Sequence, residues 1–243
     1  MSNIAYFLGT PSAWYSFFSW SKFSFTSYRI VLSLKRQGIV PKTILDVGAN
    51  VGQFAVACAK IFPGVTVHSF EPLPDCVERL KRNVARLAGV HVYPLALGEE
   101  SGEATIHVNS HSHSSSILAL GERHRRAFPS AREIGDIKVK MSTLDLEMNS
   151  MSLERPVLLK LDVQGYEALV LEGATETLDK VDYLLLEASF RPMYVGEKTF
   201  MDIARTMEDR GFEFLRPVGW LSDPDNGEVL QMDALFVKSG SRS

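Results

Sequence analysis

The chain has 243 residues, of which 45% are hydrophobic, 23% charged and 10% aromatic, as in an ordinary globular protein. This composition excludes a disordered or collagen-like chain, and the length favours a single hydrophobic core. The formal net charge of -3 supplies no overall positive field, so we expect no nucleic-acid partner.

The two cysteines, Cys58 and Cys76, have neither the spacing of metal ligands nor the pattern of a disulfide framework. We interpret both as packing residues. The sequence therefore favours a reducing, cytoplasmic compartment, and it predicts no metal site.

Ten of the 24 aromatic residues fall between positions 1 and 28. This stretch is not a signal peptide, because Lys22, the first basic residue, follows the apolar residues instead of preceding them. It is also too interrupted by polar residues to span a bilayer. We divide the chain into an aromatic-rich N-terminal arm, 1–40, and a folded domain, 41–243. The arm either packs its aromatics on the core or serves as an acceptor lid or a peripheral membrane anchor.

From Thr43 onward, short apolar runs alternate with amphipathic stretches, which is typical of βα units around a parallel sheet. Helices are predicted over 51–62 and 74–87, where apolar residues recur with a helical period. Strands are predicted at 43–47, 65–71, 91–97, 157–162 and 181–187.

The remaining segments complete the predicted fold. GEESG at 98–102 predicts a hairpin between PLAL and ATIHV, and a further strand is expected at 137–143. The polar stretch 108–136 is expected to leave the core as an excursion. Two antiparallel strands, 213–218 and 231–238, end the chain. The fold class is therefore α/β, a doubly wound, mostly parallel sheet with an antiparallel C-terminal strand pair.

The first chemical motif is a glycine-containing turn between a strand and a helix, followed by a carboxylate at the tip of the next strand. It comprises Asp46, Gly48, Asn50 and Gly52, with Glu71 nineteen residues further on. Such a turn lets backbone approach a nucleoside cofactor, and such a carboxylate can accept both hydrogens of a ribose diol. A dinucleotide fingerprint needs three glycines, of which only the first is present, so S-adenosylmethionine fits better than NAD. The alternative is a tight turn with a solvated glutamate.

The second motif is an apolar strand that carries two charged residues towards its C-terminal end, Lys160 and Asp162. Ligands of open α/β sheets bind outside the carboxyl ends of the strands. Asp162 is therefore expected to point into the crevice that holds the cofactor.

Six segments stand out along the chain: DVGANVGQF, FEPLP, LALGEESGEA, the serines 114–116, STLDL and LLKLDVQGYEALVLEGA. Together they resemble the motifs of the FkbM-type S-adenosylmethionine-dependent methyltransferases. The resemblance covers roughly residues 40–238, and the aromatic arm lies outside it. It implies a class I methyltransferase fold, Rossmann-like, and methyl transfer to a hydroxyl oxygen, with sugars and macrolide rings among the acceptors.

Transfer to a hydroxyl requires alignment of donor and acceptor and a group that removes the hydroxyl proton. We predict that Asp162 is this base; the alternative is an N-terminal cap for the helix that begins near 166. Lys160 either orients Asp162 or the acceptor, or forms a structural ion pair. Glu187, at the next strand tip, is expected to bind sugar hydroxyls or to be structural.

Three weaker signals concern the acceptor. His111 and His113 are alternative bases or parts of a solvated loop. The basic run 123–126 suits a phosphate or carboxylate on the acceptor, or forms a charged helix face. Tyr194 and Trp220 either stack on a sugar ring or pack in the fold.

The sequence thus predicts an S-adenosylmethionine-dependent O-methyltransferase of a carbohydrate hydroxyl, for example a deoxysugar such as fucose in a glycolipid or lipo-oligosaccharide. The arm would then contact the lipid at the membrane surface. The alternatives are a macrolide or other secondary metabolite as acceptor, or a non-catalytic nucleoside-binding module that recruits a partner. A pure binding module has no need of the charged pair Lys160 and Asp162.

Overall fold

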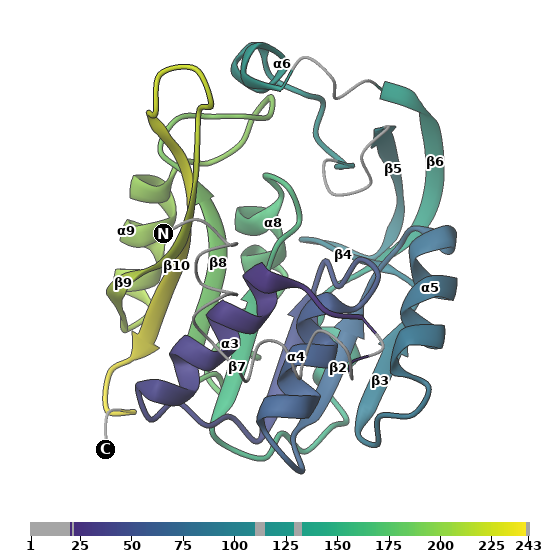
Figure 1. Ribbon diagram of the computed structural model, residues 1–243, viewed down its shortest axis with the longest axis vertical. Coiled ribbons are helices and arrows are strands. Elements are labelled where there is room, and N and C mark those ends of the chain that lie inside the picture. The colour runs from purple at the N-terminus through teal and green to yellow at the C-terminus, as the bar shows by residue number, and fades with distance from the viewer. Residues whose placement is uncertain (1–19, 21, 110–114, 129–132, 242–243) are drawn as a thin grey trace.

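In the computed structural model, residues 20, 22–109, 115–128 and 133–241 are described. They form a seven-stranded sheet with helices on both faces and a three-stranded sheet beside it (Figure 1).

The seven-stranded sheet has the strand order β3-β2-β1-β7-β8-β10-β9. The first five strands run parallel, and β10 is antiparallel to both β8 and β9. This is the predicted fold class, with the predicted strand pair at its C-terminal edge. The bounds are β1 Thr43–Val47, β2 Thr66–Phe70, β3 Val90–Tyr93, β7 Val157–Leu161, β8 Tyr183–Ser189, β9 Phe212–Ser222 and β10 Val229–Lys238.

The helices cover the sheet in two groups. Apolar residues of α3, α4 and α5 form one core cluster with one face of the sheet, and those of α8 and α9 form a second cluster with the other face. Both predicted helices are confirmed as α4 and α5, where Cys58 and Cys76 are buried. No helix in the described part of the chain is long and apolar enough to cross a membrane. The bounds are α3 Phe25–Arg36, α4 Gln53–Ile61, α5 Pro74–Val84, α6 Glu122–Ala127, α7 Leu144–Met148, α8 Glu167–Glu172 and α9 Phe200–Asp209.

Helix α3 lies within the predicted arm. The Ser24 side chain accepts a hydrogen bond from the amide of Ser27 and caps its N-terminus. Val31 and Leu34 are fully buried in the cluster that α3 shares with α4. The arm's aromatics before residue 20 lie outside the described residues, so their membrane or lid role stays a prediction, as does the division of the chain at residue 40.

Two predictions around residues 91–102 are wrong. The predicted strand 91–97 divides at Pro94, which has no amide hydrogen to donate to a sheet: β3 joins the large sheet and β4, Ala96–Leu97, joins the small one. The predicted hairpin does not form either. In the small sheet, β4 and β5, Gly102–Asn109, both pair with β6, Glu133–Ser142, which lies between them.

We predict that α3 contributes to global stability. Leu34→Ala removes a fully buried side chain and should lower the free energy of unfolding by about 2–5 kcal/mol. Leu146→Ala is the matched control, because Leu146 is 60% exposed, and should change it by less than about 0.5 kcal/mol. Urea denaturation of both variants measures the difference, and equal midpoints would show that α3 is peripheral to the core.

Candidate functional site

The turn after β1 lies against the segment that follows β7. Gly48 has φ 76°, and a Cβ at this position would lie 1.9 Å from the backbone carbonyl oxygen of Asp162. Any larger residue would therefore push the two segments apart. The two predicted motifs meet here, at the carboxyl ends of neighbouring strands.

Glu71 follows β2 and is 5% exposed. Its Oε2 accepts a 2.8 Å hydrogen bond from the amide of Asn50, and its Oε1 accepts one of 2.9 Å from the amide of Leu73. Burial raises the pKa of Glu71 to about 7, against the opposing effect of these two bonds. Each carboxylate oxygen keeps one further lone pair, so the group can still accept two hydroxyl hydrogens, as a ribose diol requires.

Lys160 is buried between two carboxylates. Its Nζ lies 3.2 Å from Asp46 Oδ1 and 3.5 Å from Asp162 Oδ2, and it donates a 3.2 Å hydrogen bond to the Gly48 carbonyl. Asp46 and Lys160 are register partners on β1 and β7. Burial alone would lower the pKa of Lys160, but the two carboxylates raise it above its usual range. Lys160 is therefore a charged ammonium group.

A network of side-chain amides joins Asp162 to Glu187. Gln164 Nε2 donates to Asp162 Oδ1 at 2.8 Å and to Glu187 Oε2 at 3.1 Å, and its Oε1 accepts from the Tyr194 hydroxyl at 2.7 Å. Gln231 Nε2 donates to the same Glu187 oxygen at 3.2 Å. Burial, and then the charge of Asp162, raise the pKa of Glu187 well above its usual range. Glu187 is therefore harder to ionise than an ordinary glutamate.

Two cavities adjoin these groups. The first, about 350 Å³, contains Glu71 and is named the Glu71 cavity; the second, about 500 Å³, contains Asp233 and is named the Asp233 cavity. The residues that line both are Gly48, Asn50, Asp162, Glu187, Leu221 and Gln231. The cavities thus share one wall, and Asp162 and Glu187 belong to it.

The structure brings most of the sequence-predicted site residues to this wall or beside it. Asp46 is fully buried and lines neither cavity, but it pairs with Lys160. Gly52, with φ 88°, lines neither cavity and faces Leu80 of α5. Asp162 does not cap α8, whose N-cap is Tyr166.

The residues predicted to contact the acceptor lie in different parts of the structure. His111 and His113 lie outside the described residues. Tyr194 is buried, whereas Trp220 is 68% exposed and lines the Asp233 cavity. The basic run 123–126 forms most of α6.

Sequence reasoning missed three residues of the site. Gln164 lies inside the motif that carries the resemblance, and its positive φ of 57° marks it as conformationally unusual. Gln231 is a polar residue in an apolar strand. His124 stands in the sequence as one member of a basic run, yet it is buried and lines the Glu71 cavity.

The chain matches a family model described as the methyltransferase FkbM domain over residues 46–214. It is 26% identical over 174 residues to the 2-O-methyltransferase NoeI of Sinorhizobium fredii, covering 68% of this chain and 72% of that protein. It is 32% identical over 142 residues to the hexuronic acid methyltransferase AglP of Haloferax volcanii, covering 58% and 54%.

A more distant protein shares the fold. The crystal structure of magnesium protoporphyrin IX methyltransferase from Synechocystis PCC 6803 with bound SAM matches with a TM-score of 0.50 and 12% identity. The match covers 88% of this chain and 78% of that one, which supports the class I methyltransferase fold.

We predict that cofactor affinity depends on the ionisation of Glu71. Because the carboxylate is the form that accepts two hydroxyl hydrogens and its pKa is about 7, the Kd of S-adenosylhomocysteine should fall about tenfold between pH 6 and pH 7.5. Glu71→Gln should bind more weakly than the wild type at pH 7.5 and lose this pH dependence. Calorimetry at both pH values measures this, and a pH-dependent Kd retained in the variant would assign the titration to another group.

Proposed function

The chain belongs to the FkbM methyltransferase domain family, and on this premise we propose that it transfers a methyl group to a hydroxyl oxygen of a carbohydrate. The observation that carries this proposal is the wall shared by the two cavities. There a partly exposed carboxylate, Asp162, lies beside the buried ammonium group of Lys160 and is joined through Gln164 to Glu187, whose pKa is raised. This arrangement suits removal of a proton from a neutral acceptor.

S-adenosylmethionine is the cofactor of this family, and it supplies a methyl group on a positively charged sulfur that leaves without protonation. Gly48 fits it, because it lines both cavities and its lack of a side chain lets the turn after β1 lie directly against the Asp162 backbone. Glu71 fits its ribose, because both carboxylate oxygens retain a lone pair. We propose that Gly48, Asn50 and Glu71 hold the cofactor. Asp46 contributes indirectly, through its ion pair with Lys160.

Asp162 is the proposed base. As the oxygen–methyl bond forms and the sulfur–methyl bond breaks, the acceptor hydroxyl loses its proton to Asp162. Lys160 and Gln164 each hold one of its two oxygens, which fixes the orientation of the carboxylate. Glu187 accepts hydrogen bonds from Gln164 and Gln231 on Oε2, which leaves Oε1 to bond to a second hydroxyl of the acceptor.

The names of two relatives support a sugar acceptor, since one is a 2-O-methyltransferase and the other a hexuronic acid methyltransferase. Within that class we propose a deoxysugar such as fucose in a glycolipid or lipo-oligosaccharide. The support is the mixed lining of the Glu71 cavity, where polar groups face the apolar Ile106, Ile117 and Phe128. A sugar that carries a methyl group in place of one hydroxyl matches such a surface.

A macrolide hydroxyl is the second candidate, favoured by 28% identity over 155 residues to the 31-O-demethyl-FK506 methyltransferase of Streptomyces tacrolimicus. The deciding experiment is incubation with labelled S-adenosylmethionine and a panel of fucosylated, uronic-acid-containing and macrolide acceptors, followed by mass spectrometry. Label on a sugar oxygen supports the proposal. Label on the macrolide alone, or cofactor binding without transfer to any of them, contradicts it.

We predict that Asp162→Asn separates the possible roles of this residue. The amide keeps the shape and most polar contacts but cannot take the proton, so kcat should fall about 10²–10⁴-fold while the cofactor Kd stays nearly constant. Asp225→Asn, in the exposed β9–β10 turn, is the control and should leave turnover unchanged.

Two other results would contradict the base role of Asp162. Unchanged turnover would mean that another group or water takes the proton. A Kd that rises for S-adenosylmethionine but not for uncharged S-adenosylhomocysteine would instead indicate that Asp162 balances the sulfonium charge.

A further inference from the structure

His124 is a buried histidine with an unused hydrogen-bonding atom. It belongs to α6, is 5% exposed and lines the Glu71 cavity. Its Nδ1 is buried and has no hydrogen-bond partner among the described residues. An unpartnered buried polar atom costs about 1–3 kcal/mol, so a native protein that keeps one beside a cavity has a reason to do so.

The imidazole is uncharged at neutral pH. Burial, and then the positive charge of Arg125, lower the pKa of His124. A neutral imidazole has one nitrogen that donates a hydrogen bond and one that accepts. It therefore matches a hydroxyl group, which can do both, better than an anion, which can only accept.

The backbone holds His124 over the cavity. The amide of Gly121, just before α6, donates a 2.8 Å hydrogen bond to the carbonyl oxygen of Met193. A Cβ on Gly121 would lie 2.7 Å from that oxygen, so only glycine allows this approach. On the outer side of α6, Arg123 pairs with Glu228 of the β9–β10 turn at 3.2 Å. Figure 1 shows α6 at the top of the molecule, away from β2, whose end carries Glu71.

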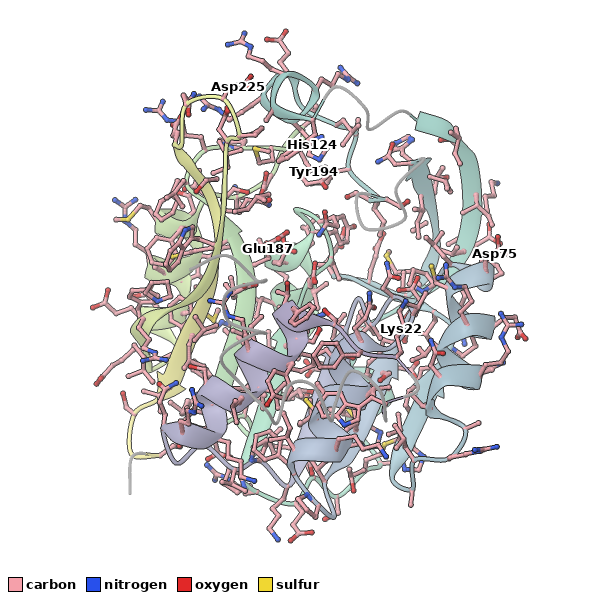
Figure 2. All side chains as sticks on the ribbon, in the orientation of Figure 1. Lys22, Asp75, His124, Glu187, Tyr194 and Asp225 are labelled. Carbon is pink, nitrogen blue, oxygen red and sulfur yellow. The ribbon has the colours of Figure 1, made fainter. Side chains whose placement is uncertain are left out.

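Contacts also connect His124 to the proposed base. Its ring lies 5.5 Å from that of Tyr194, whose hydroxyl bonds to Gln164, which in turn bonds to Asp162. In Figure 2, His124 and Tyr194 lie close together, with Glu187 below them. Asp162 and His124 line the same cavity, so a sugar with one hydroxyl at Asp162 can extend within it towards His124.

We infer that His124 is an acceptor-binding residue, which exchanges a hydrogen bond with a neutral hydroxyl of the carbohydrate other than the one that is methylated. This inference rests on the proposed function. It assigns the two parts of the Glu71 cavity to different ligands: the cofactor ribose at Glu71, and the far side of the acceptor at His124. It also makes His124, and not its arginine neighbours, the residue of the basic run that selects the acceptor.

The test measures binding of methyl α-L-fucopyranoside to the full chain saturated with S-adenosylhomocysteine, by saturation-transfer NMR. His124→Phe keeps the packing on Tyr194 and Phe128 but has no polar atom, and it should weaken sugar binding about tenfold. His124→Asn places an amide near the position of Nδ1 and should recover most of the affinity. His91→Phe, an exposed histidine on β3, is the control and should bind as the wild type does.

The outcomes distinguish this inference from the proposed function, because sugar binding is measured without turnover. Equal sugar affinity in His124→Phe and the wild type would overturn the inference and leave the acceptor panel to decide the function. A wild type that does not bind the sugar would also overturn it. A loss of S-adenosylhomocysteine affinity in His124→Phe would assign the residue to the cofactor instead.

Discussion

The arrangement of the site depends on one buried ammonium group placed between two carboxylates. Lys160 on β7 pairs with Asp46 on the neighbouring strand β1 and with Asp162 just beyond its own strand. Asp46 is fully buried, so its charge requires a partner inside the protein. Lys160 supplies that partner, and its remaining contacts, with the Gly48 carbonyl and Asp162, tie the glycine turn to the proposed base. One ion pair thus fixes the geometry of both motifs.

This part of the structure could be predicted because it follows from local patterns. Short apolar runs separated by amphipathic stretches specify parallel strands with helical crossovers, and parallel strands place their carboxyl ends at one edge. Charged residues at strand ends, such as Glu71 and Asp162, must then lie near each other whatever the exact packing. The helix boundaries followed from apolar periodicity in the same way, to within about three residues.

The rest depends on contacts between segments distant in sequence. The strand order β4-β6-β5 depends on which strands pair with each other. The alternation of apolar and polar residues along 98–108 does not show that β6 lies between β4 and β5. His124 reads as part of a charged helix face, because its burial arises from packing on Tyr194, seventy residues later. The roles of Gln164 and Gln231 arise from side-chain bonds to Glu187 across three segments, which no spacing in the sequence records.

The same ion pair limits what substitution can reveal about the site. Neutralising Lys160 would leave Asp46 with an unpaired buried charge, a change that typically costs about 3–5 kcal/mol, so lost activity could reflect unfolding alone. Asp162 is different: its side chain is 44% exposed, and Lys160 keeps Asp46 as a partner when Asp162 is neutralised. Neutralising Asp162 leaves the buried ion pair between Lys160 and Asp46 intact. Asp162 is therefore the member of the group whose chemical role can be tested separately from its structural role.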